Sequence, residues 1–537
     1  MTASRMELHG DRLLRCYTDR PSAVDAMFRE AVARAGDAPA LVDGELRLSY
    51  RALDREVERT AAGLAAHGVK AGDRVAVVLS NRAEAALSVL AIARLGAVLV
   101  PIGTRLREPE VAYILQNAEA GCLIYEGVFE AEMPRGFPAL RFRVDAGTRD
   151  VPSFATLRAA AGDAPTVEVD EDDLYGILYT SGTTGQPKGA MLSHLGVVHS
   201  VLHWREVLRL GPAERTVLCI PWSHVAGLCG VLLPFLCMGH CVVMMREFKR
   251  RDFLALAQRE RITHALLVPA MYGLCLLEPD LEHFDLSSWR LGLFGSAPMP
   301  EPTIRRFAQV FPGLVMCNAY GATETTSPAT VMPPGQGDAR LDSIGRVVPC
   351  GELRVMDDAG REVAPGEDGE LWIAGPMVVS GYWRNEEADR RSFAQGFWRS
   401  GDIGSVDAEG FVRIADRQKD MINRGGFKVY PAEVENVLSD LPEVVEAAVV
   451  GRVDAMLGEG VVAFLNVRSL ADGTPAIDAA TVHAFCVQRM ADYKVPGAVV
   501  IGTEALPRNA NGKIQKDPLR ALAAALPASP RVAPNAR

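Results

Sequence analysis

Residues 179–189 read Tyr-Thr-Ser-Gly-Thr-Thr-Gly-Gln-Pro-Lys-Gly and follow directly on the apolar stretch 174–178. Glycine lets backbone N–H groups approach an anion closely, and the Ser and Thr hydroxyls add further donors. Lys188 brings a compact positive charge. The run lacks the spacing of a Walker A loop, so an ordinary P-loop nucleotide triphosphatase is not indicated. The stretch still predicts a cradle for the phosphates of a nucleotide triphosphate.

Helix and strand patterns alternate on both sides of this cradle. Apolar residues recur at helical spacing from 53 to 64, and an apolar run at 75–79 predicts a buried strand. Asn81 and Glu84 resemble a capping box at the start of the next helix. Further short apolar runs, each expected to be a strand, lie at 97–101, 242–245, 265–268 and 291–294. This alternation predicts an α/β fold with mostly parallel sheets covered by helices on both faces.

The pattern changes beyond residue 420. Apolar runs at 444–450, 461–467 and 499–501 surround a helical pattern at 479–490. We expect a separate small α+β domain here. A chain of 537 residues is also too long for one ordinary core, which favours at least two domains.

Composition limits the classes of function. The chain has 48% apolar and 23% charged residues, an ordinary balance for a globular protein. Its net charge is −10, with 57 basic and 67 acidic side chains and no block of like charge. Nucleic acid is therefore not an expected partner.

The cysteines and the apolar runs indicate where in the cell the protein is expected. The ten cysteines are scattered, with no C-x-x-C, so buried reduced thiols are expected rather than disulfides or zinc. Residues 225–245 carry no formal charge, but glycine and proline interrupt them, which favours an interior helix and strand over a transmembrane segment. Residues 1–20 are charged throughout and lack an apolar core, which argues against a secretory signal. A cytoplasmic protein is expected.

The run at 180–189 resembles the signature of the adenylate-forming superfamily, which includes acyl-CoA synthetases, peptide-synthetase adenylation domains and luciferases. Further stretches match the family in order and spacing along almost the whole chain. They are Tyr320-Gly321-Ala322-Thr323-Glu324, Ser400-Gly401-Asp402, Asp416-Arg417-Gln418-Lys419-Asp420, and Pro507 followed by Gly512-Lys513. The resemblance implies a large N-terminal domain (1–417), a hinge (418–419) at Lys419, and a small mobile C-terminal lid (420–537).

The same resemblance implies sites for ATP or AMP and for Mg²⁺. The nucleotide ligands would be Thr180, Ser181, Gly182, Thr183, Thr184, Lys188, Gly295, Ala297, Tyr320, Gly321, Thr323, Asp402 and Arg417. Within this set, Tyr320 would lie against adenine and Asp402 would bind the ribose hydroxyls. Thr184 and Glu324 would hold Mg²⁺, a cation that prefers hard oxygen ligands.

Activation of a carboxylic acid by ATP brings two anions together and therefore needs a positioned cation. Lys513 lies in a turn-rich loop and is the expected catalytic lysine, because the family's lysine at this place reaches both the carboxylate and the α-phosphate. Lys516 is expected to be solvated. Gly425 and Gly426 resemble the family's segment that forms the pantetheine tunnel, which implies coenzyme A as co-substrate.

The stretch Trp222-Ser223-His224-Val225-Ala226-Gly227 resembles the family's acyl-pocket segment. The expected pocket residues are Trp222, His224, Gly227 and Ala297, with a catalytic contribution from His224. Amino-acid-activating relatives use an aspartate where His224 stands, so a fatty or aromatic acid is favoured.

The sequence thus indicates an AMP-forming acid–thiol ligase that forms an acyl-adenylate, releases pyrophosphate and transfers the acyl group to coenzyme A. Two alternatives stay open: a stand-alone enzyme that loads a carrier protein, and an acyl-nucleotide-binding protein without turnover. The expected partners are small molecules, and a homodimer is an open possibility.

Overall fold

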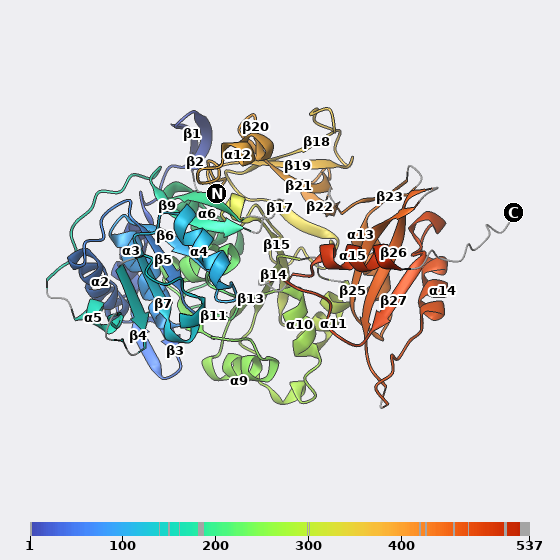
Figure 1. Ribbon diagram of the computed structural model, residues 1–537, viewed down its shortest axis with the longest axis horizontal. Coiled ribbons are helices and arrows are strands. Elements are labelled where there is room, and N and C mark those ends of the chain that lie inside the picture. The colour runs from blue at the N-terminus through green and yellow to red at the C-terminus, as the bar shows by residue number, and fades with distance from the viewer. Residues whose placement is uncertain are drawn as a thin grey trace, which may run out of the picture.

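The computed structural model describes most of the chain. The described residues are 3–138, 140–145, 147–148, 151–159, 162–180, 187–297, 299, 301–417, 420–424, 427–454, 457–470, 472–509 and 513–526. Within them, a large domain carries two sheets, and a smaller domain with its own sheet lies beside it, drawn in orange to red in Figure 1.

The first sheet of the large domain is mostly parallel. Its described strands, in spatial order, are β10 (Lys188–Ser193), β9 (Leu174–Thr180), β6 (Val98–Pro101), β5 (Arg74–Val78), β7 (Cys122–Glu126) and β8 (Leu140–Val144). Only β10 runs antiparallel to its neighbour, β9. The expected strands at 75–79 and 97–101 are confirmed as β5 and β6.

The second sheet combines a parallel half with an antiparallel half. The parallel half consists of β15 (Val315–Tyr320), β14 (Leu291–Gly295), β13 (His264–Leu267), β11 (Arg215–Leu218), β12 (Cys241–Met244) and β3 (Pro39–Asp43). Antiparallel strands continue it at both edges: β4 (Leu46–Ser49), β16 (Thr330–Val331), β17 (Ser343–Val347), β18 (Glu352–Met356), β19 (Gly369–Ala374), β20 (Phe393–Ala394), β21 (Phe397–Val406) and β22 (Phe411–Arg417). The mostly parallel description therefore holds for the first sheet and for only one half of the second.

Helix α3 (Ala83–Arg94) shows how the two sheets form one core. It contacts β5 and β6 of the first sheet and β3 of the second. Nearly every residue of α3 is buried, as expected for a helix covered on all sides. The other helices of the large domain are α1 (Val24–Ala35), α2 (Tyr50–Ala66), α4 (Glu108–Asn117), α5 (Ala155–Arg158), α6 (His194–Leu208), α7 (Val225–Gly227), α8 (Leu233–Met238), α9 (Arg250–Glu260), α10 (Pro269–Leu276), α11 (Glu301–Val310) and α12 (Glu386–Ser392).

The starts of helices α2 and α3 are held in different ways. Ser49 caps α2 by accepting a hydrogen bond from the Ala52 N–H, at 3.3 Å. The capping box expected at Asn81 and Glu84 is wrong, because Arg82 is the N-cap of α3 and makes no side-chain cap. The Ala83 N–H donates instead to Asp43 of the neighbouring sheet, at 2.9 Å. The carboxylate of Asp43, which is distant in sequence, thus accepts the hydrogen bond that a local cap would otherwise accept.

The C-terminal domain is α+β, as expected. Its sheet contains β24 (Phe427–Val429), β23 (Ile422–Arg424), β26 (Gly458–Val467), β25 (Val444–Asp454) and β27 (Ala498–Gly502). Helices α13 (Pro431–Ser439), α14 (Ala479–Arg489) and α15 (Lys516–Ala525) complete it. The strands up to Arg417 pair within the large domain and those from Ile422 pair here. The boundary at 418–419 itself lies outside the described residues and stays a prediction.

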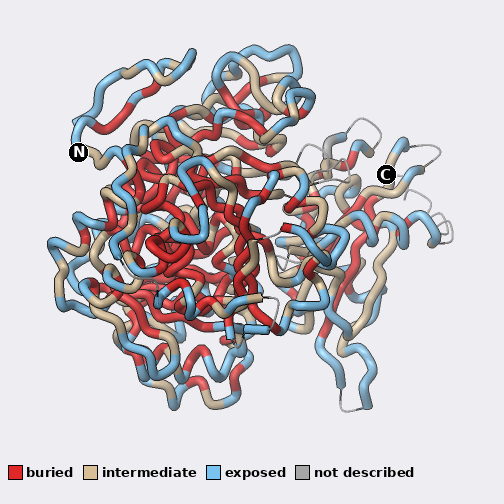
Figure 2. The backbone as a smooth tube through the Cα atoms, turned by 60° about the vertical axis from the view of Figure 1, so that its left-hand side comes forward, coloured by how far each residue is buried: buried red, intermediate tan, exposed pale blue. Residues whose placement is uncertain are grey.

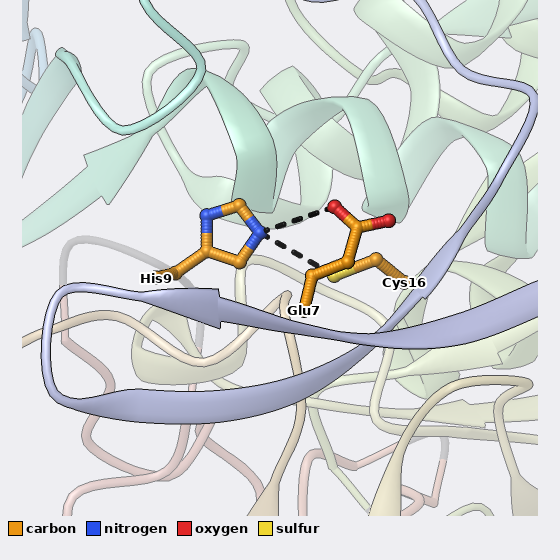
Figure 3. A group of neighbouring side chains, drawn as sticks. All are labelled: Glu7, His9 and Cys16. Atoms are coloured by element: carbon orange, nitrogen blue, oxygen red, sulfur yellow. Dashed lines mark hydrogen bonds and ion pairs between the residues drawn. The ribbon is translucent and has the colours of Figure 1, made fainter.

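An N-terminal hairpin was not expected from the sequence. Strands β1 (Ser4–His9) and β2 (Arg12–Tyr17) pair antiparallel at the top of the large domain in Figure 1. Glu7, His9 and Cys16 of this hairpin point toward one another, as Figure 3 shows. Arg20 donates to both oxygens of Glu7, at 2.7 and 3.1 Å, and lowers the pKa of that carboxyl to about 2. The ion pair with Arg20 thus accounts for the Glu7 carboxylate.

Buried side chains gather in the large domain, where the tube of Figure 2 is mostly red. The cysteines are free thiols, and all are buried except Cys350, which is half-buried. This confirms the expectation of reduced, buried thiols. Within the described residues, no helix has both the length and the apolar composition needed to cross a bilayer.

Candidate active site

The expected substrate-binding residues follow strands of the parallel half-sheet. Trp222 and His224 come after β11, Ala297 after β14 and Glu324 after β15. These three strands are parallel and are connected through β13. Their carboxyl ends therefore lie at one edge, which is where α/β sheets bind ligands.

Gly295 ends β14, the strand that leads to Ala297, another expected nucleotide ligand. It pairs with Ala319 of β15, and a Cβ atom at position 295 would lie only 2.2 Å from the Ala319 carbonyl oxygen. A residue without a side chain is required here because the two backbones approach so closely. Ser296 adopts a left-handed φ of 66°, which turns the chain toward Ala297.

Tyr320 and Asp402 come together from distant parts of the sequence. Tyr320 ends β15, and its hydroxyl donates to Asp402 Oδ2 on β21 at 2.5 Å. Asp402 is buried, and in the β-ladder it pairs with Arg417 of β22, whose side chain is not described. A hydrogen bond thus joins Tyr320, which is expected to lie against adenine, to Asp402, which is expected to bind the ribose.

Glu324 belongs to a short 3₁₀ turn, Thr323–Thr325, in which Thr323 is buried. Gly321, just before this turn, packs close to the backbone at 327–329. The Tyr382 hydroxyl donates to Glu324 Oε1 at 2.7 Å. Among the described residues, no hydrogen bond to Glu324 Oε2 is present, so this hard oxygen fits a Mg²⁺ ligand.

Tyr382 also connects Glu324 to Lys188, the first residue of β10. Its ring lies 5.1 Å from the ammonium nitrogen of Lys188, in a cation–π arrangement. Burial first, and then the charge of Glu324, raise the pKa of Tyr382, so the hydroxyl stays protonated and remains a donor. Nothing in the sequence motifs singled out Tyr382, because both partners lie more than fifty positions away along the chain.

The loop that carries Trp222 is held by Asn81, a residue that sequence reasoning assigned to a helix cap. The Asn81 amide donates to the carbonyls of Leu218, Ile220 and Met245 at 2.9–3.1 Å. Its oxygen accepts from the Trp222 N–H at 3.0 Å. Trp222 itself is buried and donates to the Leu79 carbonyl at 2.7 Å. Both the amide nitrogen and the oxygen of the Asn81 side chain thus make hydrogen bonds that hold this loop.

His224 is half-buried at the start of α7. Its Nδ1 accepts a hydrogen bond from the Ala226 N–H at 3.3 Å, so the neutral imidazole carries its proton on Nε2. Burial and then the positive charge of Lys513 lower the pKa of His224 to about 4. The charge of Lys513 in the small domain therefore acts on His224 in the large domain.

The loop of Lys513 is anchored on its own domain. The Lys513 N–H donates to the Asn509 side chain at 3.0 Å, and the Lys513 carbonyl accepts from the Asn509 N–H at 2.9 Å. Lys516 was expected to be solvated, and this is wrong. Its ammonium nitrogen lies 2.8 Å from Oε1 of Glu435, a residue of α13.

Several predicted site residues lie outside the described residues. They are Ser181, Gly182, Thr183 and Thr184 of the phosphate cradle, Lys419 at the hinge, and Gly425 and Gly426. Thr180 is described at the end of β9. Gly227 is explained by packing, since a Cβ atom there would lie 2.2 Å from the Pro221 carbonyl oxygen, and its place in the acyl pocket stays a prediction.

Comparisons with known proteins show the family. The AMP-binding enzyme family matches residues 28–383, and the AMP-binding enzyme C-terminal domain matches residues 433–513. The chain is 36% identical to an indoleacetate–CoA ligase of Aromatoleum aromaticum, over 89% of this chain and 94% of the relative. It is 35% identical to a long-chain-fatty-acid–CoA ligase of Mycobacterium tuberculosis, over 89% of this chain and 93% of the relative.

A solved structure shares the fold. The o-succinylbenzoate coenzyme A synthetase of Bacillus subtilis, in complex with ATP and a magnesium ion, superimposes with a TM-score of 0.79 at 28% identity, covering 93% of this chain and 98% of that one. The resemblance drawn from the motifs is therefore confirmed. The chain belongs to the AMP-binding enzyme family and has the two-domain fold of the adenylate-forming acyl-CoA synthetases.

Proposed function

We propose that this enzyme activates a fatty or aromatic carboxylic acid with ATP and then transfers the acyl group to coenzyme A. The single observation that best supports the proposal is that the charge of Lys513, on the small domain, acts on His224 of the large domain. A cation from the small domain stands next to the loop expected to hold the acid. An acid and a triphosphate repel each other, and a positioned ammonium group offsets that repulsion.

In the first step, a carboxylate oxygen attacks the α-phosphorus of ATP. A new oxygen–phosphorus bond forms as the bond to the leaving pyrophosphate breaks. Lys513 would contact the carboxylate and the α-phosphate, while Lys188 would contact the phosphates. Neutral His224 presents its Nε2–H and adds no second positive charge, because its pKa lies near 4. Tyr320 and Asp402 would hold the nucleoside.

Glu324, with Thr184, would hold Mg²⁺. When bound, the ion would neutralise phosphate charge as a Lewis acid. Tyr382 would fix the carboxylate of Glu324 by donating to Oε1, which leaves the other oxygen for the ion.

In the second step, the sulfur of coenzyme A attacks the acyl carbon, the thiol proton is lost and AMP leaves. A rotation of the small domain about Lys419 would withdraw Lys513 and bring Gly425 and Gly426 to the pantetheine chain. These roles rest on the family resemblance.

Isotope exchange between pyrophosphate and ATP tests this function with a panel of arylacetic, cinnamic and fatty acids, with and without coenzyme A. We expect acid-dependent exchange without coenzyme A, and formation of a thioester when it is added. Exchange without any thioester would favour a carrier protein as acceptor. A complete lack of exchange with every acid would favour the binding protein without turnover.

We also propose a cytoplasmic location, which the reduced, buried thiols support. Assembly as a homodimer is a further proposal. Size-exclusion chromatography with light scattering tests it directly, and a mass corresponding to one chain would exclude a stable dimer.

A further inference from the structure

The N-terminal hairpin β1–β2 precedes residue 28, where the match to the AMP-binding enzyme family begins. It contacts the large domain through Arg12, whose side chain points into the molecule. Arg12 Nη1 donates to the carbonyls of Val378 and Val379, at 3.0 and 3.2 Å, and Nη2 donates to the Gly375 carbonyl at 3.2 Å. One guanidinium thus holds three carbonyls of one turn.

That turn leads directly to the residues around Glu324. The Val379 N–H donates to the Glu324 carbonyl at 2.9 Å, and Tyr382, three positions on, donates to the Glu324 carboxylate. The same segment joins the strand that begins with Lys188, because the Trp383 N–H donates to the Gly189 carbonyl at 2.7 Å. The turn held by Arg12 therefore sets the backbone and the side-chain contact of Glu324.

The hairpin is fixed on its other side to the turn before β9. His9 Nδ1 lies 2.9 Å from Asp172 Oδ1, and Arg20 donates to both oxygens of Glu171 at 2.8 and 2.9 Å. Strand β9 runs from this turn to Thr180, where the phosphate cradle begins. The hairpin thus connects the strand before the cradle to the turn beside Glu324.

We propose that Arg12 is a positioning residue for the ATP-dependent half-reaction. By holding the turn at 375–379, it fixes Glu324 and Tyr382 and so sets the affinity of the site for magnesium-bound ATP. The inference rests on the proposed role of Glu324. It predicts a defect confined to adenylation, whereas a purely structural role would lower stability and affect both half-reactions alike.

The test uses the full chain with Arg12→Ala. At a temperature where circular dichroism shows the variant folded, adenylation is measured against free Mg²⁺ at saturating ATP and acid. The affinity for magnesium-bound ATP is measured separately by calorimetry without acid and should fall in parallel. We expect adenylation at limiting Mg²⁺ to fall by about 10- to 100-fold, the range typical for residues that orient metal ligands. Thioester formation from supplied acyl-adenylate should stay within about twofold of the unaltered enzyme, because it requires no triphosphate.

Two variants sharpen the result. Arg15→Ala removes the same charge from the same strand, but its side chain is exposed, so it should leave the Mg²⁺ dependence unchanged. Arg12→Lys keeps the charge without the planar fork and should give a smaller shift in the same direction; it replaces the alanine variant if that one does not fold. Equal loss of both half-reactions, or an unchanged Mg²⁺ dependence, would overturn the inference.

Glu324→Gln separates this inference from the proposed function. If Glu324→Gln raises the Mg²⁺ requirement and Arg12→Ala does not, only the role of Arg12 fails. If Glu324→Gln leaves the Mg²⁺ requirement unchanged, the proposed metal ligand is wrong, and the role of Arg12 falls with it.

Discussion

Lys513 of the small domain lies close enough to His224 of the large domain for its charge to lower the pKa of the imidazole, which burial already lowers, to about 4. The two residues are almost three hundred positions apart in the chain. This is the arrangement expected for the adenylation step, in which the lysine acts on the carboxylate of the acid. The arrangement for thioester formation would separate them.

The pKa of His224 reports this proximity in solution. Replacing Lys513 by Ala removes a positive charge that disfavours the imidazolium form, so the pKa of His224 should rise from about 4 while burial keeps it below the usual value. NMR titration of histidine-labelled protein measures it, with His224→Gln to assign the signal. Lys516→Ala, which removes a lysine paired with Glu435, should leave the value unchanged. An unaltered pKa in the Lys513 variant would show that the two residues do not meet.

Lys513→Ala should separate the two half-reactions. Loss of a positioned cation at the point where charge develops should slow adenylation by about 10² to 10³-fold. Thioester formation from supplied acyl-adenylate should be largely retained. Single-turnover assays of each half-reaction measure both rates, again with Lys516→Ala as the matched control. Similar losses in both steps would reject this division of roles.

The hydrogen bond between Tyr320 and Asp402 should contribute to ATP binding. Tyr320→Phe keeps the ring but removes the hydroxyl that orients the carboxylate, a bond to a charged group worth about 1.5–3 kcal/mol. We expect the KM for ATP to rise by about tenfold or more, with little change in the KM for the acid. Asp402→Asn should give a similar effect, and the double variant should be less than additive. Fully additive effects would argue that the two side chains act independently.

Gly295 should tolerate no side chain. A methyl group at this position would lie 2.2 Å from the Ala319 carbonyl oxygen and would push β14 away from β15. Gly295→Ala should lower stability by about 1–3 kcal/mol, measured by denaturant unfolding. Gly273→Ala is the control, because a methyl group there would meet no atom within 4 Å and α10 should gain about 0.5–1 kcal/mol. Equal stability of the two variants would contradict the close approach.

Much of the parallel core could be predicted from the sequence, because buried parallel strands are short apolar runs between helical patterns. The runs at 75–79, 242–245 and 291–294 became β5, β12 and β14. Several antiparallel strands, such as β18 and β22, interrupt their apolar residues with charged ones and so gave no comparable run. The N-terminal hairpin was missed for a related reason, since its short strands mix charged and apolar residues without forming an apolar run.

The site residues also divide into those that the sequence predicted and those that it did not. Motif residues such as Tyr320, Glu324 and Asp402 were predicted, because their order along the chain matches the family. Tyr382 and Asn81 were not, because their function lies in hydrogen bonds to residues far away in sequence. Asn81 even satisfies a local helix-start pattern that the fold does not use. Short-range signals cannot reveal partners that only tertiary structure brings together.

The burial of the native thiols has a practical consequence for following the proposed domain rotation. All of the cysteines are buried except the half-buried Cys350, and burial raises the pKa of that thiol to about 11, so maleimide dyes should react slowly with the unaltered enzyme. Val453 is 88% exposed at the end of β25 in the small domain. A fluorophore attached to Val453→Cys would therefore report on movement of that domain during turnover against a nearly silent background.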